Sequence, residues 1–241
     1  MPVVTEDASY TRPGVHRDRV APWQHTALVV LVCVLWAMFG ALRASHGFGA
    51  DTPRWLRYSG QLLVLWLMTG TTVAGLYHRR RFIRAAVGHI DWVRDAWAGL
   101  GIFLGGTAVL FAAGLLLRPL HFLHLTHLHD AVVALAPHTN LELALWMFVS
   151  ASAGFCEEFM FRGYLLRQVL SWTGSNAVAV ALTAILFGSM HLYEGTAAAI
   201  QIGALGAWFA VMAIRRGSLR QVMIAHFLQD AIAGLVLFLR H

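Results

Sequence analysis

The chain contains no lysine, few acidic residues and only two cysteines. All 18 basic residues are arginines, against 12 Asp and Glu. Charged residues make up 12% of the 241 positions, roughly half the share that is usual in soluble globular domains. Cys33 and Cys156 lie inside apolar runs and are too few for a disulfide framework, so we interpret them as packing residues. This scarcity of charge excludes an ordinary soluble domain and favours a lipid bilayer as the solvent.

Long apolar runs account for most of the remaining sequence. Hydrophobic residues form 58% of the chain, and the mean hydropathy is +0.62. Runs long enough for membrane helices cover roughly 25–42, 56–77, 97–117, 141–161, 176–192, 196–214 and 219–239. The fourth is predicted to continue as a helix to about residue 172. The sequence therefore predicts an all-α, polytopic membrane helix bundle with about seven transmembrane helices, and an eighth if residues 121–136 insert.

The distribution of arginine suggests how the chain is organised. No cleavage site follows the first apolar run, so we interpret that run as a membrane helix and not as a signal peptide. Residues 1–22 before it are polar and are predicted to be a disordered cytoplasmic tail. Residues 23–139 would form N-terminal membrane helices and their connections, with a short interfacial helix in the basic segment 78–96, and residues 140–241 a second helical unit. With the N-terminus in the cytoplasm, most arginines fall on the inner side. We expect an integral protein of a bacterial plasma (inner) membrane, with lipids and no nucleic acid among its partners.

Several ionisable residues lie within the predicted helices of the second unit. An ionisable side chain at bilayer depth costs several kcal/mol and is rare without a reason. The set is Glu157, Glu158, Arg162, His191, His226 and Asp230. Structural ion pairs between or within helices are the simplest explanation for any one pair, such as Glu158 with Arg162. Two carboxylates and two imidazoles together exceed what packing needs, so we interpret the set as a catalytic site.

Helical geometry suggests which of these side chains meet. Glu157 and His191 lie at similar distances on either side of the turn at 172–176, so a helical hairpin would bring them face to face. His226 lies closer to its own turn, and the same count leaves its contact open. A Glu and a His that share a water form a general base, and a second His can stabilise an oxyanion. This chemistry suits hydrolysis of a peptide bond inside the membrane.

Three motifs carry a resemblance to a known family. They are EExxxR (Glu157, Glu158, Arg162), FxxxH (Phe187, His191) and HxxxD (His226, Asp230). Their order and spacing resemble the CPBP (CAAX protease and bacteriocin-processing) family of intramembrane endopeptidases, which includes the CAAX prenyl protease 2-like enzymes. The resemblance covers roughly residues 140–235 and identifies residues 140–241 as a CPBP-type catalytic helical core.

The resemblance implies a role for each motif residue. Glu157 would activate water with His191 as its partner, and Glu158 with Arg162 would organise the site. His226 and residue 230 would form the oxyanion side. Prenyl-processing relatives resemble this chain but carry Asn where it has Asp230, and an ionised Asp cannot donate to an oxyanion, so Asp230 is expected to orient His226 instead. The substrate would be a peptide or protein, lipidated or membrane-anchored, and CAAX proteins, leader peptides and sorting tails all stay open.

Three alternatives accompany this hypothesis. Glu157, His191 and His226 are residue types that bind a divalent metal such as zinc, so a metalloprotease stays open beside a metal-free glutamate protease. A second possibility is a non-catalytic membrane protein, such as a bacteriocin-immunity or scaffold factor. A third is a metal-dependent oxidoreductase that uses the histidines of 121–138. That segment contains His121, His124, His127, His129, Asp130 and His138, and we favour an interfacial amphipathic helix there.

Overall fold

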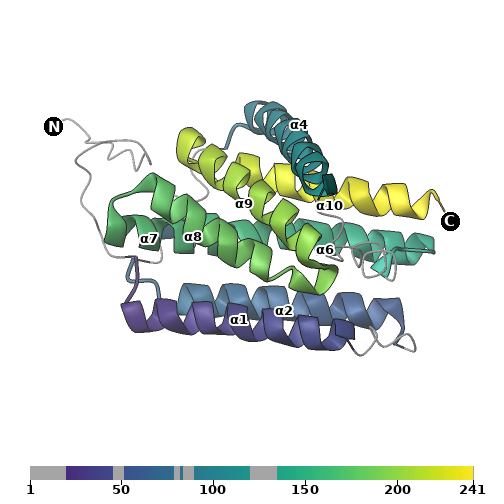
Figure 1. The fold of residues 1–241 in the computed structure, drawn as a ribbon, viewed down its shortest axis with the longest axis horizontal. Helices are drawn as coiled ribbons and strands as arrows, with labels where there is room; N and C mark the ends of the chain where they lie inside the picture. The colour runs from purple at the N-terminus through teal and green to yellow at the C-terminus, as the bar shows by residue number, and fades with distance from the viewer. Residues whose placement is uncertain (1–19, 46–51, 79–81, 84–89, 120–134, 241) are drawn as a thin grey trace.

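The computed structural model is all-helical throughout the residues that it describes, which are 20–45, 52–78, 82–83, 90–119 and 135–240 (Figure 1). The main elements are α1 (Trp23–Ser45), α2 (Arg54–Ala74), α4 (Trp92–Leu117), α6 (Asn140–Glu158), η2 (Phe159–Leu165), α7 (Leu166–Thr173), α8 (Asn176–Ser189), η3 (Leu192–Glu194), α9 (Thr196–Arg216) and α10 (Arg220–Phe238). Because α6, η2 and α7 form one continuous helix over Asn140–Thr173, the bundle has seven long helices within the described part.

These seven helices confirm the predicted fold class and match the seven predicted spans. Five of them are long and apolar enough to cross a membrane. The other two are α2 and the 14-residue α8, which is shorter than the predicted run 176–192. The helix α4 begins at Trp92, so it includes the end of the basic segment 78–96. Residues 79–81 and 84–89 of that segment, and nearly all of 121–136, lie outside the described residues, so the interfacial helix and the eighth span stay predictions.

Local turn chemistry sets the helix boundaries around the second unit. The α6 helix begins with a capping box, in which Thr139 accepts from the Glu142 backbone and the Glu142 carboxylate accepts from the Thr139 backbone. Gly174 ends α7 in the left-handed region at φ 66°, and the Ser175 side chain caps α8 directly afterwards. Gly217 ends α9 in the same way at φ 64°. These glycines allow the sharp reversals that join α7 to α8 and α9 to α10.

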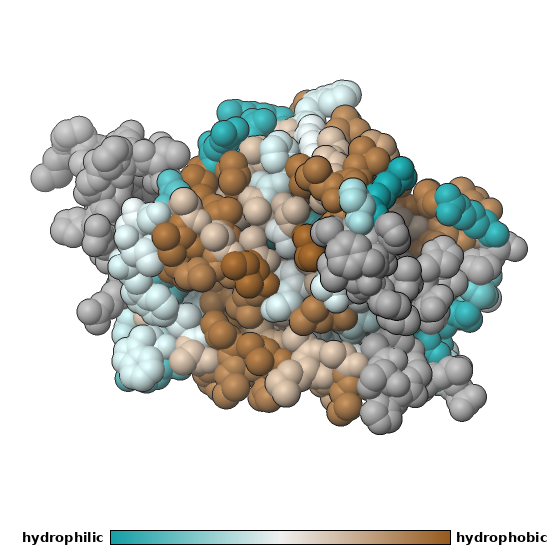
Figure 2. Space-filling model, in the orientation of Figure 1, coloured by the Kyte–Doolittle hydropathy of each residue, from teal (hydrophilic) through white to brown (hydrophobic). Residues whose placement is uncertain are grey.

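The two predicted units pack into one bundle. The helix α2 packs on α6, and α4 packs on both α9 and α10. Within the second unit, α8 packs on α9, while α10 packs mainly along α6 and α4. Many large apolar side chains of α1, α2 and α4 are exposed, among them Leu31, Leu67 and Phe111. Figure 2 shows hydrophobic residues across the middle of one face and hydrophilic patches toward its edge, as expected for helices that face lipid.

Close packing at one glycine sets the position of α10 on α6. A Cβ added to Gly154 would lie 2.8 Å from the Met223 carbonyl oxygen and 3.0 Å from the Phe227 amide nitrogen. Nearby, the Trp146 indole N–H donates to the Asp230 carbonyl at 2.9 Å. Small residues let helix backbones approach closely in membranes. The approach at Gly154 therefore fixes the segment that carries His226 beside the end of α6.

Candidate active site

A π-helical segment follows the two acidic residues of the EExxxR motif. The helix changes from α to π at Phe159, directly after Glu158, and returns to α at Leu166. All seven residues of this segment are buried, including Arg162. The sequence predicted an ordinary helix through this region, because helical periodicity carries no signal for one wide turn. Short π segments inside α-helices are rare and frequently mark functional sites.

Glu158 and Arg162 form a fully buried ion pair across this turn. Their exposed fractions are 0% and 1%, and Arg162 Nη1 lies 2.9 Å from Glu158 Oε1. The other terminal nitrogen, Nη2, donates to the Gly206 carbonyl at 2.8 Å, and the guanidinium lies over the Phe187 ring at 4.4 Å from its centroid. A planar guanidinium can donate to two different acceptors in its plane while its face stacks on an aromatic ring, so it suits this environment. The pair thus connects α6 to α8 and α9.

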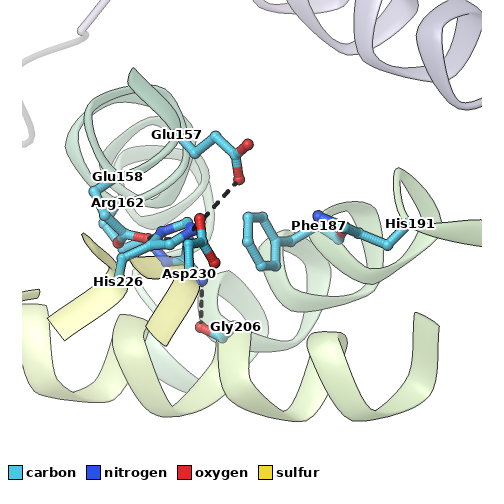
Figure 3. Close-up of polar contacts among 8 residues, drawn as sticks. All are labelled: Glu157, Glu158, Arg162, Phe187, His191, Gly206, His226 and Asp230. Atoms are coloured by element: carbon cyan, nitrogen blue, oxygen red, sulfur yellow. Dashed lines mark hydrogen bonds and ion pairs between the residues drawn. The ribbon is translucent and has the colours of Figure 1, made fainter. Parts of the chain in front are cut away.

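His226 extends this buried network to α10. Its Nδ1 lies 2.8 Å from Glu158 Oε1, and the histidine is 6% exposed. The other ring nitrogen, Nε2, lies 3.5 Å from Asp230 Oδ2 and 3.9 Å from Glu157 Oε2 (Figure 3). Glu158 therefore fixes the orientation of the imidazole, and Nε2 faces the two more accessible carboxyl groups. The contact with Asp230 is the one that an orienting role would require.

Counting residues along the helices did not show whether His226 lies level with Glu157 and His191. The count measured the position of His226 from the turn that joins α9 to α10, as if α10 were packed beside α9. The structure instead packs α10 mainly along α6 and α4. Its register is therefore set by contacts such as the one at Gly154, and these bring His226 to Glu158. This position depends on packing between helices and not on loop length.

His191 lies on the other side of Phe187. Its Nδ1 bonds to the Phe187 carbonyl oxygen at 2.9 Å, and the two ring centroids are 5.1 Å apart. The Phe187 ring lies between His191 and the side chains of His226 and Asp230, while the Glu157 carboxylate lies above the ring in the same view (Figure 3). The described residues show no hydrogen bond or ion pair between Glu157 and His191, so a water shared by the two side chains stays a prediction. The helix α8 ends at Ser189, so His191 lies in the following turn and off the helical register that counting assumed.

The predicted metal ligands do not converge. Zinc–ligand bonds are about 2.0–2.3 Å long, so donor atoms must surround one point. The 3.9 Å between His226 Nε2 and Glu157 Oε2 is close to the separation of two ligands of one zinc ion, but the Phe187 ring lies between His191 and His226. Among the described residues, no group of three or more His, Cys, Asp and Glu side chains has a metal-binding arrangement. This geometry does not fit a three-ligand metal centre, and we derive no step through a metal.

The histidine segment contributes one described residue. His138 is exposed, and its Nε2 lies 3.2 Å from Nη2 of Arg54. His121, His124, His127, His129 and Asp130 lie outside the described residues, so both interpretations of that segment stay predictions. Both cysteines are buried, as their apolar surroundings indicated.

Two contributions to the site were not found from the sequence. The Gly206 carbonyl accepts from Arg162, and nothing in the composition of the α9 segment distinguishes that glycine from its neighbours. Tyr193 stacks on His191 with ring centroids 6.0 Å apart. The only sequence feature that could have identified Tyr193 is its position two residues after the motif histidine, in a segment that the sequence indicated only as a turn.

Part of the chain matches a known protein family. Residues 139–232 match the family described as Rce1-like, the type II CAAX prenyl endopeptidases. No curated protein and no solved structure matches the chain. The matched range begins at the N-cap of α6, ends within α10 and contains all six predicted site residues. With five helices long and apolar enough to cross a membrane, this integral membrane protein is similar over residues 139–232 to the Rce1-like family of type II CAAX prenyl endopeptidases.

Proposed function

We propose that this protein is an intramembrane endopeptidase in which Glu157 is the general base for an attacking water. The observation that carries the proposal is the division of labour among the carboxyl groups. Glu158 is fully buried and bonded to both Arg162 and His226, whereas the Glu157 side chain keeps 17% of its surface exposed. A buried, doubly bonded carboxylate organises a site, and a partly exposed one can reach a water and a substrate.

The proposed steps follow from this arrangement. Glu157 takes a proton from water while the water oxygen attacks the scissile carbonyl carbon. The carbonyl oxygen becomes an oxyanion, which a proton on His226 Nε2 would stabilise, because Nδ1 is already occupied by Glu158. When the C–N bond breaks, Glu157 returns the proton to the leaving amine. Products are a carboxylate and an amine, and the enzyme is regenerated without a covalent intermediate.

His191 and Asp230 have supporting roles in this scheme. Asp230 lies 3.5 Å from His226 Nε2 and would orient the ring toward the oxyanion position. His191 faces the same space from across Phe187, with Nδ1 held by a backbone carbonyl. Its Nε2 would hold the attacking water or the substrate backbone on the side opposite to His226. In this role His191 would be the partner of Glu157 through the water that both contact.

The substrate is proposed to be a membrane-anchored protein or peptide, because the polar site lies among helices whose outer surface is apolar. Prenylated CAAX peptides are the class that the family description names. Leader peptides and C-terminal sorting tails have the same need for cleavage near a membrane. A panel of matched peptides, prenylated and unprenylated, would separate these classes.

The decisive experiment compares two identical substitutions on one helix. The purified protein in proteoliposomes is assayed for peptide cleavage as wild type, Glu157→Gln and Glu142→Gln. Glutamine at 142 preserves the capping box, so this control should keep its activity. Glu157→Gln should lower kcat by at least a hundredfold, the lower range for a lost general base. Wild-type cleavage by Glu157→Gln would refute the mechanism. Absence of cleavage by the wild type across the panel would favour a non-catalytic scaffold.

A further inference from the structure

His191 is held between two aromatic rings. Phe187 lies on one side at 5.1 Å between centroids, with an interplanar angle of 53°. Tyr193 lies at 6.0 Å with an angle of 28°, which is a stacked arrangement. The one hydrogen bond of the imidazole within the described residues goes from Nδ1 to a backbone carbonyl. A single hydrogen bond does not fix the orientation of the imidazole plane. The two flanking aromatic rings therefore limit rotation of the His191 side chain.

Tyr193 in turn rests on the first helix of the chain. The helix α1 packs against η3, the short turn that contains Tyr193. The contact is closest at Gly40, where an added Cβ would lie 3.3 Å from Tyr193 Cδ1 and 3.4 Å from its Cβ. Any larger side chain at this position would push the tyrosine ring. Gly40 is therefore the point at which α1 determines where Tyr193 lies.

The opposite end of α1 is fastened to the π-helical segment. His25 Nδ1 lies 2.8 Å from the Tyr164 hydroxyl, and Thr26 Oγ1 lies 2.9 Å from the same atom. Gln168 bonds to both the backbone N–H and the carbonyl of Ala21. These polar contacts are concentrated at one end of α1 and fix it relative to the helix that carries Arg162. A contact made at Gly40 is thus made by an anchored helix.

From these contacts we propose that Tyr193, supported by Gly40 of α1, is a positioning residue that orients His191 for catalysis. The proposal rests on the proposed function for the role of His191. It extends the functional unit beyond residues 139–232, because α1 lies outside the range that matches the family. The stacking ring, and not the hydroxyl, performs the positioning. Phenylalanine should therefore replace tyrosine, and alanine should not.

The first test measures cleavage by Tyr193→Phe, Tyr193→Ala and Tyr193→Leu in proteoliposomes. Tyr193→Phe should keep kcat within about twofold, since the ring contact remains, while Tyr193→Ala and Tyr193→Leu should lower kcat roughly tenfold with little change in KM. Thermal unfolding in detergent shows whether each variant is folded. A folded Tyr193→Ala or Tyr193→Leu variant with wild-type kcat would overturn the proposal.

The second test asks whether α1 acts through Tyr193. Gly40→Val should lower kcat in the wild-type background and have no further effect in Tyr193→Ala, because the displaced ring is then absent. Equal effects of Gly40→Val in both backgrounds would refute the coupling. Gly70→Val on α2 is the matched control, since nothing lies within 4 Å of a Cβ added there.

The third test does not depend on activity. Histidine-labelled protein is followed by NMR, and the His191 signal is assigned by its loss in His191→Gln. Tyr193→Ala should move this signal through the lost ring current, while Tyr193→Phe should leave it near its wild-type position. An unmoved His191 signal in Tyr193→Ala would refute the positioning role even if Glu157→Gln abolishes cleavage. If Glu157→Gln stays active, the proposed function fails, and this measurement still decides whether Tyr193 orients His191.

Discussion

Glu158 and His226 are 68 residues apart in the chain, yet Oε1 of the first lies 2.8 Å from Nδ1 of the second, with both side chains buried. The same carboxylate oxygen also bonds to Arg162. One oxygen therefore joins the π-helical segment to α10. Because such contacts are poorly replaced by water in a buried site, the network should be sensitive to loss of any one partner.

Replacing Arg162 alone should destabilise the protein more than replacing both Arg162 and Glu158. Arg162→Leu would leave Glu158 as a buried charge without its cation, at a cost of about 3–5 kcal/mol. The double variant Glu158→Gln, Arg162→Leu should recover part of this loss. Reversible unfolding in detergent, with Arg215→Leu at the end of α9 as a control for lost arginine, measures the difference. A double variant less stable than Arg162→Leu would contradict the buried-pair explanation.

Gly154→Ala should separate α10 from α6. The new Cβ would lie 2.8 Å from the Met223 carbonyl, and backbone atoms cannot move aside as a flexible side chain can. We expect loss of most cleavage activity and a destabilisation of about 1–3 kcal/mol from overpacking. The same change at Gly101 meets nothing within 4 Å and should be neutral or slightly stabilising. Equal behaviour of the two variants in the cleavage and unfolding assays would show that the approach at Gly154 is unimportant.

Asp230→Asn should retain cleavage within about tenfold of wild type. Asparagine keeps the size and an oxygen near His226 Nε2, and it adds an N–H that can donate to an oxyanion. Asp230→Ala keeps neither contact and should be the more damaging change. Steady-state kinetics on one peptide compare the two. If Asp230→Ala were as active as Asp230→Asn, residue 230 would not orient His226.

Chelators should leave the initial rate unchanged. The Glu157, His191 and His226 side chains do not surround a common point, because Phe187 lies between the two histidines. The measurement is cleavage after incubation with 1,10-phenanthroline, compared with a non-chelating phenanthroline isomer to control for effects on the membrane. Loss of activity only with the chelator, and recovery with added zinc, would show that the site rearranges to bind metal.

Several features of the fold could be predicted from local sequence. Seven apolar runs predicted seven helices, because a backbone in lipid must satisfy its hydrogen bonds internally and the helix does so within one segment. The reversals at Gly174 and Gly217 follow from glycine's access to positive φ. Ionisable residues in three of these helices identified the candidate site, since charge at bilayer depth is costly.

The arrangement within the site depended on the tertiary structure. Helical counting predicted that Glu157 faces His191, but α8 ends at Ser189, so His191 lies in the turn that follows, beside Phe187. Counting left His226 open, and close packing at Gly154 brings it to Glu158. The π turn after Glu158 has no periodic signal in the sequence. Helix formation depends on neighbours a few residues apart, so the sequence by itself determined the helices and which of them carry charge. The pairing of those charges depends on contacts between distant helices, which only the packed bundle decided.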